Sequence, residues 1–320
     1  MLQYLIILLD DTSTSYCHYD NDRRENKLIP IGVLKQGIRY AMTENLMIQF
    51  VYPDYELPLE YKEVIETIDH SNIISSLCED KSLVDEADVV IFHDWIGLDY
   101  FTFEVDKAYV LRTTKVDLFD RNLSLKNILA KVARLNVVIT DVDSFSEVDF
   151  ELYKKVLQCL SEHIEKMYVE GKSPQLNLLT DRMMLEKMNN CGAGDTNITL
   201  APNGKFYVCP AFYYENETDC IGDLESGLDI KNKQLYKLQY APICRNCDAY
   251  QCKRCIWLNR KMTLEVNTPS HEQCVLAHLE RNVSRDLLAN IRKHGTFLPE
   301  QDDIKVIDYL DPFDKLTKTL

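Results

Sequence analysis

Residues 244–255 read CRNCDAYQCKRC, and this stretch decides how the C-terminal half of the chain folds. It holds two Cys-x-x-Cys pairs, Cys244 with Cys247 and Cys252 with Cys255, separated by four residues. At that spacing a tight turn can point both thiolates of a pair at one ion or cluster. Thiolate is the preferred ligand of zinc and of iron in iron-sulfur clusters. The stretch therefore predicts a metal-binding module.

More cysteines extend this module in both directions. Eight of the chain's 11 cysteines fall in one region, and we predict these as the metal ligands: Cys191, Cys209, Cys220, Cys244, Cys247, Cys252, Cys255 and Cys274. The alternative for Cys220 is a small buried apolar residue beside Ile221. Residues 242–274 show little apolar periodicity, so we expect metal ligation to supply the order that a core cannot.

Composition limits the classes of partner. The 320 residues carry a formal net charge of -15, which excludes the concentrated Lys and Arg of a nucleic-acid-binding surface. The apolar start, MLQYLIILLDD, lacks a positive flank and runs into Asp10 and Asp11, so it predicts a buried strand rather than a signal peptide. No apolar run reaches the ~18 residues that span a bilayer. We expect a cytoplasmic protein without membrane contact, in which clustered cysteines indicate metal rather than disulfides.

The N-terminal half alternates strands with helices. Short continuous apolar runs predict buried parallel strands, with a weaker one at Ile73 and Ile74: Tyr4–Leu9, Leu46–Tyr52, Asp88–His93, Ala108–Arg112, Asn136–Thr140 and Leu176–Leu179. A helix follows Ser146, which pairs with Asp149 as a cap. The pattern predicts an α/β fold with a partial (β/α) barrel. A hairpin over residues 198–208, turning at Gly204, ends it.

These observations predict three parts: a partial barrel over residues 1–182, a cysteine-rich domain over 183–282, and a C-terminal helix with an acidic tail over 283–320.

The cysteine order Cys191-x12-Gly204-x4-Cys209, followed by the two pairs and Cys274, resembles the SPASM domain. This domain extends radical S-adenosylmethionine enzymes that mature peptides. The resemblance implies two auxiliary 4Fe-4S clusters, the first held by Cys191, Cys209 and Cys255 and the second by Cys244, Cys247, Cys252 and Cys274. Cys220 is the internal candidate for the fourth ligand of the first cluster. An open iron that accepts a substrate thiolate is the alternative.

The N-terminal part resembles the barrel of the same superfamily with its cofactor motifs lost. A radical enzyme of this class needs a CxxxCxxC loop after the first strand, but residues 13–20 read STSYCHYD and retain only Cys17. Ser and Asp are poor substitutes for thiolate on a 4Fe-4S cluster. Residues 51–58, VYPDYELP, likewise replace the glycine-rich motif that contacts the cofactor. We therefore do not expect this chain to cleave S-adenosylmethionine.

The combination is similar to the CXXX repeat peptide maturases. That resemblance implies maturation of a ribosomally synthesised, cysteine-rich Cys-x-x-x repeat precursor, beside a true radical S-adenosylmethionine enzyme as partner. A non-enzymatic zinc scaffold that recognises the peptide is the alternative.

Two further groups of side chains accompany the cysteines. His271 and His278 flank Cys274 at helical spacing, either as metal ligands or as groups that support the site from outside. Arg245 lies within the first cysteine pair, and Lys253 and Arg254 lie within the second. Either their charge offsets that of the thiolates, or they are solvated loop residues.

Overall fold

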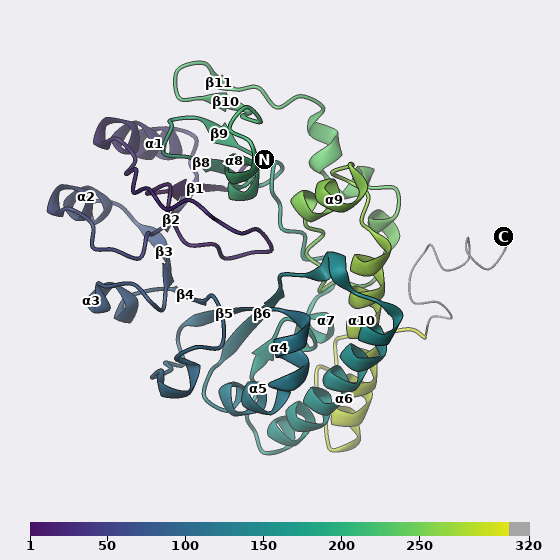
Figure 1. Ribbon diagram of the computed structural model, residues 1–320. Helices are drawn as coiled ribbons and strands as arrows, with labels where there is room; N and C mark the ends of the chain where they lie inside the picture. Colours follow the sequence, from purple (N-terminus) through teal and green to yellow (C-terminus); the bar gives the residue numbers. More distant parts are fainter. Residues whose placement is uncertain (307–320) are drawn as a thin grey trace. The chain divides into compact units, whose positions relative to one another are not determined.

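The computed structural model describes residues 1–306, which form two compact units (Figure 1). The first unit contains Met1–His93 and Gly192–Tyr240, and the second contains Asp94–Cys191 and the chain from Ala241 onward. Residues 307–320, the end of the predicted acidic tail, lie outside the described part. Each unit is described by itself below.

The first unit is built on a mostly parallel sheet. Its strands follow the order β4-β3-β2-β1-β8-β9, and only β9 runs antiparallel to its neighbour. The central strand β1 has the sequence YLIIL and is almost entirely buried, as a parallel strand covered on both faces requires. The strands are β1 (Tyr4–Leu8), β2 (Met47–Val51), β3 (His70–Ser75), β4 (Val89–Phe92), β8 (Asn197–Leu200) and β9 (Phe206–Tyr207), and a separate hairpin joins β10 (Gly222–Asp223) to β11 (Gly227–Leu228).

Helices connect these strands, as the alternating sequence pattern predicts. They are α1 (Ile31–Thr43), α2 (Leu59–Ile65), α3 (Lys81–Asp85) and α8 (Pro210–Glu215). Helix α1 packs closely on the sheet at Gly37, where an added Cβ would lie 2.4 Å from Leu200 Cδ2. The hairpin β8–β9 turns at Gly204, which has a φ of +79°. This left-handed conformation favours glycine, because in other residues the Cβ would crowd the residue's own backbone.

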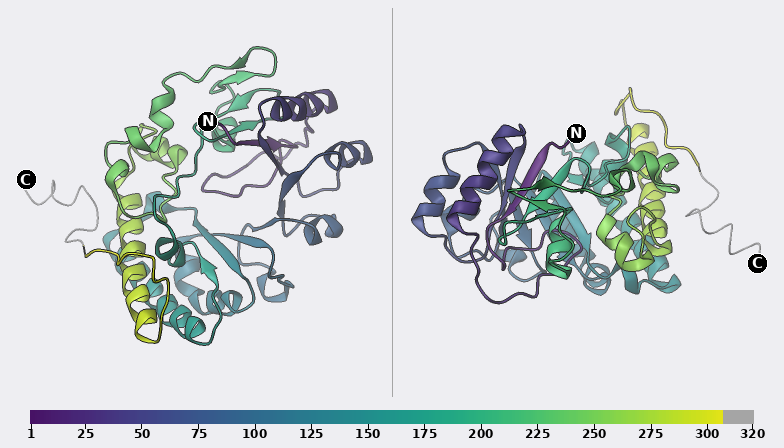
Figure 2. Two further views of the ribbon diagram at one scale, coloured as in Figure 1. Left: turned by 180° about the vertical axis from the view of Figure 1, so that it is seen from behind. Right: turned by 90° about the horizontal axis from the view of Figure 1, so that it is seen from above.

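The second unit combines three parallel strands with longer helices. The strands are β5 (Ala108–Thr113), β6 (Arg134–Ile139) and β7 (Gln175–Leu176), and the helices are α4 (Lys115–Asp120), α5 (Asn122–Leu129), α6 (Glu147–Val169), α7 (Thr180–Met184), α9 (Ile256–Thr263) and α10 (His271–Lys293). The long helices α6 and α10 lie side by side (Figure 2). Capping boxes fix their first turns, Ser146 with Asp149 in α6 and Ser270 with Gln273 in α10.

The predicted α/β class is confirmed, and most predicted strands and the cap at Ser146 are present. Two elements differ from expectation. β3 is a full strand from His70 to Ser75 rather than a weak one at Ile73 and Ile74, because its backbone pairs with β2 and β4 on both sides. β7 ends at Leu176 instead of Leu179, since Thr180 Oγ1 accepts from the Leu176 N–H at 2.8 Å and starts α7.

For residues 242–274 the sequence predicts that metal ligation alone orders the chain. The structure also contains two regular elements there, α9 and the start of α10. The predicted boundary at residue 282 lies inside α10, which continues to Lys293. No helix within residues 1–306 is long and apolar enough to cross a membrane.

Candidate metal centre

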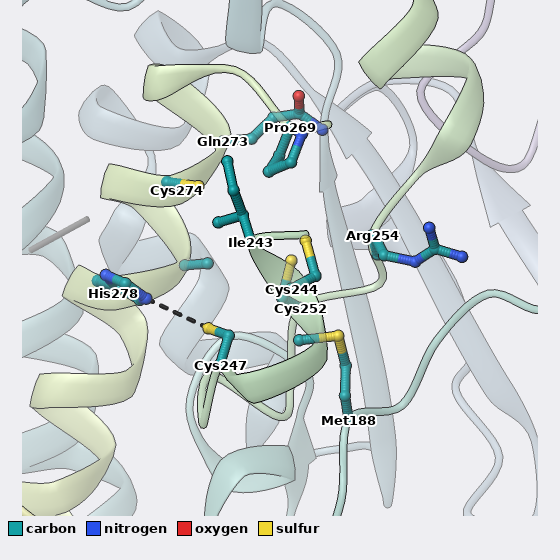
Figure 3. A pocket seen from close by; sticks show the side chains of 11 residues that line it. Met188, Ile243, Cys244, Cys247, Cys252, Arg254, Pro269, Gln273, Cys274 and His278 are labelled. Atoms are coloured by element: carbon teal, nitrogen blue, oxygen red, sulfur yellow. Dashed lines mark hydrogen bonds between the residues drawn. The ribbon is translucent and has the colours of Figure 1, made fainter. Parts of the chain in front are cut away.

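Four of the predicted ligands line one pocket in the second unit. Cys244, Cys247, Cys252 and Cys274 surround it, together with Met188 and His278 (Figure 3). These four cysteines are the set that the family resemblance assigns to a second cluster. The structure therefore places the whole set at one site.

Short elements position these thiols. Cys244 begins a 3-10 turn that ends at Asn246, and Cys247 follows directly. Cys274 lies in the first turns of α10, whose start is fixed by the Ser270 capping box. Cys244 and Cys274 are buried, whereas Cys247 and Cys252 are partly exposed as whole residues, with thiols that experience burial in the pocket lining. The turn and the helix thus bring cysteines from separate segments to the lining of one pocket.

Backbone N–H groups are aimed at two of the sulfurs. The Ala249 N–H donates to Cys247 Sγ at 3.5 Å, and the Arg254 N–H likewise hydrogen-bonds Cys252. In both cases the donor lies two residues after the cysteine. Arg254 adopts the left-handed conformation that this second turn uses, with a φ of +47°. Such donors favour the thiolate over the thiol and thereby suit a metal ligand.

Burial opposes ionisation of the same thiols. It raises the pKa of Cys252 to about 12 and that of Cys244 to about 11, and it also raises the pKa of Cys247. At neutral pH these groups keep their protons unless a metal replaces them. Metal binding in this pocket would therefore release protons.

Buried positive charge lies next to Cys247. Arg281 is fully buried and donates to both oxygens of Asp248, at 3.0 Å and 2.5 Å. Arg182, only 8% exposed, contacts the same carboxylate at 3.6 Å. Both arginines act to lower the pKa of Cys247. Because two guanidinium groups share one carboxylate, this corner favours a further negative charge, such as a thiolate centre would supply.

His278 lies against the same sulfur. Its Nε2 is 3.3 Å from Cys247 Sγ, and the side chain is only 4% exposed (Figure 3). Burial lowers the pKa of His278 to about 4, although Asp248 opposes this effect. The imidazole is therefore neutral at neutral pH. It is one of the two histidines that flank Cys274 in the sequence, and the other, His271, does not line the pocket.

The pocket offers suitable donors but no finished ion site. Within residues 1–306, no group of three or more His, Cys, Asp and Glu side chains is arranged to hold a metal ion. An all-sulfur donor set suits both a 4Fe-4S cluster and zinc. The residues thus fit the implied group by chemistry.

The first predicted ligand set is divided between the units. In the second unit, the Cys191 N–H donates to Lys253 O at 2.9 Å, and Cys191 Sγ lies 4.0 Å from Arg254 O, so Cys191 lies beside the segment that holds Cys255. Cys209 and Cys220 belong to the first unit. The grouping of Cys191, Cys209, Cys220 and Cys255 at one site stays a prediction.

Within the first unit, Cys209 and Cys17 share a neighbour. Cys209 caps α8, and both Cys17 and Cys209 contribute to raising the pKa of Tyr19, whose main cause is burial. Cys220 instead contributes to raising the pKa of Tyr207, whose main cause is also burial. The sequence pattern predicts Cys220 as the fourth ligand of the first cluster. It contains no signal that Cys17 and Cys209 lie near the same tyrosine.

Residues 13–20, the loop that would carry the cofactor cysteines, make hydrogen bonds and ring contacts with other segments of the first unit. Ser13 Oγ donates to Val51 O at 2.9 Å, and Thr14 Oγ1 and His93 Nε2 are 2.7 Å apart. Tyr19 stacks on Tyr214, with ring centroids 5.6 Å apart. Polar and aromatic groups of the chain thus hold this loop at the carboxyl ends of the strands.

Comparison with known proteins gives structural neighbours only. No family model and no curated protein sequence matches the chain. The solved structure of polyhistidine-tagged anSMEcpe with bound AdoMet, an anaerobic sulfatase-maturating radical S-adenosylmethionine enzyme, has a TM-score of 0.61 at 12% identity and covers 97% of each chain. Native anSMEcpe with bound AdoMet and Cp18Cys peptide has a TM-score of 0.60 at 13% identity, covering 92% of this chain and 100% of the other.

Streptococcus suis SuiB bound to precursor peptide SuiA is more distant, with a TM-score of 0.46 at 12% identity over 86% of this chain and 76% of that one. At such identities only the anSMEcpe likenesses are informative, and they concern the fold. The chain therefore shares the α/β fold of the anSMEcpe structures.

Proposed function

We propose that the chain takes part in maturing a ribosomally synthesised peptide rich in cysteine, using iron-sulfur clusters held by its SPASM-like half. The observation that carries the proposal is the pocket of Cys244, Cys247, Cys252 and Cys274. The fold shared with anSMEcpe supports it, since one structure of that enzyme contains a peptide.

The pocket residues would hold the second 4Fe-4S cluster, and Cys191, Cys209 and Cys255, with Cys220 or a substrate thiolate, would hold the first. Such clusters supply one-electron transfer or an open iron for a thiolate. The chain's own part is to bury the thiols, aim N–H donors at them, and neutralise their charge with Arg182 and Arg281.

Cofactor cleavage would come from a partner. The anSMEcpe structures contain AdoMet. In this chain the corresponding loop has Cys17 alone, and its Ser13 and Thr14 hydroxyls are already hydrogen-bonded. We therefore propose a separate radical S-adenosylmethionine enzyme as partner, with this chain as scaffold and electron carrier. The alternative is a zinc-binding scaffold that recognises the peptide without redox chemistry.

Metal and acid-labile sulfide analysis after anaerobic purification tests the metal content. We expect about eight iron and eight sulfide per chain for two clusters, with the optical and EPR spectra of 4Fe-4S centres. Cys247→Ser and Cys274→Ser should each remove about half of both. Cys159→Ser is the matched control, because Cys159 lies on α6 outside the predicted set and bonds Asn122. Zinc without sulfide would contradict the electron-transfer function and leave the scaffold.

Peptide binding tests the substrate class. A synthetic Cys-x-x-x repeat peptide should bind the metal-loaded chain, and the same peptide with Ser at each Cys should bind more weakly. Equal affinities, measured by calorimetry, would show that cysteine is not what the chain recognises.

A further inference from the structure

The helix α10 presents two pocket-lining side chains on one face. Cys274 and His278 are four residues apart, so they lie one above the other on the same side of the helix. Both are buried, at 8% and 4% exposure. Both residues therefore line the pocket from the buried face of α10.

The contact of His278 is with a ligand sulfur. Its Nε2 lies 3.3 Å from Cys247 Sγ, and the same sulfur accepts the Ala249 N–H at 3.5 Å. A backbone N–H can only donate, and a metal-bound thiolate has no proton and can only accept. When Cys247 ligates metal, the imidazole must therefore carry its proton on Nε2 and donate it toward the sulfur.

Resting on the proposed function, we propose that His278 is not a ligand but the hydrogen-bond donor that positions the Cys247 thiolate and sets the reduction potential of the second centre. Cys244, Cys247, Cys252 and Cys274 already supply a full set of four thiolates. A hydrogen bond to a cluster sulfur stabilises the more negative, reduced state, so it raises the potential.

The charges around Cys247 act in the same direction. Arg281 and Arg182 lie on the side of Asp248, where they favour negative charge on the sulfur. Both arginines form ion pairs with Asp248, whereas His278 contacts the Cys247 sulfur directly. A variant at His278 therefore changes one donor and leaves the arginines in place.

The test compares three variants in anaerobically purified chain. His278→Leu removes the donor at similar volume, and His278→Gln keeps an amide N–H. His271→Leu is the matched control, since His271 lies on the same helix with 41% of its side chain exposed. Iron and sulfide are counted, and midpoint potentials are followed by EPR. The second centre is identified as the signal that Cys247→Ser removes.

We expect His278→Leu to retain wild-type iron and sulfide and to lower the potential of the second centre alone. His278→Gln should restore part of the shift, and His271→Leu should show none. Loss of the same iron as in Cys247→Ser, in a chain with unchanged circular dichroism, would make His278 a ligand and overturn the proposal. An unchanged potential would overturn it as well.

A wild-type chain with zinc and no sulfide would refute the redox function, and the hydrogen bond is then tested with Co(II) in place of zinc. If His278 only donates to Cys247, His278→Leu leaves the d–d bands in place and moves the thiolate-to-cobalt charge-transfer band to lower energy. A shift of the d–d bands, or no change in either, would refute it.

Discussion

Glu280 is a partly buried acid that the proposed metal chemistry does not use. Its carboxyl accepts hydrogen bonds from the Tyr153 hydroxyl at 2.7 Å and from the Gln251 amide at 3.2 Å. Burial raises the pKa of Glu280 from its ordinary 4.5 to about 7, although both hydrogen bonds oppose the rise. The carboxyl therefore costs stability once it must ionise.

The pH dependence of stability tests this cost. Between pH 4.5 and about 7, the unfolded chain loses the Glu280 proton while the folded chain keeps it, so stability falls as the pH rises. Glu280→Gln should remove this fall and raise the free energy of unfolding at pH 8 on the order of 2 kcal/mol. Glu151→Gln, at an exposed position of α6, is the control. Urea titrations at pH 4.5 and 8 that give both variants the wild-type difference would disprove the assignment.

Cysteine spacing could predict that Cys244 and Cys247 face one pocket, because a Cys-x-x-Cys pair needs only a local turn to do so. Of the second pair only Cys252 lines that pocket, so spacing alone does not place Cys255. That these thiols ligate a metal stays a prediction. His278 also has a signal, since it follows Cys274 by one helical turn. Arg182 and Arg281 have none. They meet at Asp248 from α7 and α10, and only the packing of those helices brings them there.

At the scale of elements, the proposed ligand Cys274 lies directly after the capped start of α10. The Ser270 side chain accepts the Gln273 N–H, and Gln273 bonds back to Ser270 at 2.9 Å. Ser270→Ala should cost about 1 kcal/mol and loosen the turn that holds Cys274, so iron should leave faster on dilution into chelator. Ser146→Ala removes the equivalent cap of α6, which carries no ligand, and should cost similar stability without faster loss. Equal rates of iron loss from both variants would show that the cap at Ser270 does not help Cys274 to hold iron.

Gly204, in the turn between β8 and β9, and Gly32, in α1, are two glycines that can be compared. Gly204 has a φ of +79°, and the nearest atom to an added Cβ is 3.7 Å away, so Gly204→Ala should cost about 1–2 kcal/mol from backbone strain alone. Gly32 in α1 also has open space, without a positive φ, and Gly32→Ala should stabilise by up to ~1 kcal/mol. Thermal unfolding that moves in the same direction for both would contradict the strain argument.

Elements with a continuous apolar run or a strong cap could be predicted from the sequence, as β1 and α6 show. β3 could be predicted only in part, since its first residues His70, Ser71 and Asn72 are polar. Its neighbours in the sheet, and not its side chains, make it a strand. A local sequence pattern does not contain information about hydrogen bonds from neighbouring strands.

At the scale of the whole molecule, the net charge of -15 should influence which peptide binds. A Cys-x-x-x repeat peptide with Lys between its cysteines should bind more tightly than one with Glu, and the difference should shrink as salt is raised from low to high concentration. Fluorescence anisotropy measures both. A preference that survives high salt would point to specific contacts instead of overall charge.

The fold class could be predicted because alternating strands and helices leave few arrangements. The division into units could not. The first unit joins residues 1–93 with residues 192–240, and β8 pairs with β1 across that distance in sequence. The sequence predicts parts that follow one another along the chain. Strand pairing instead depends on which buried strands match in register, and this can join segments that are distant in the sequence.

The crowding of thiols in the pocket also bears on handling in air. Cys244 and Cys247 are close enough to Cys252 to raise its pKa. If the metal is lost while oxygen is present, neighbouring sulfurs can join as a disulfide, and a joined pair can no longer receive iron. Air exposure would then produce a fraction of the chain that does not take up added iron until a thiol reductant has cleaved the disulfide.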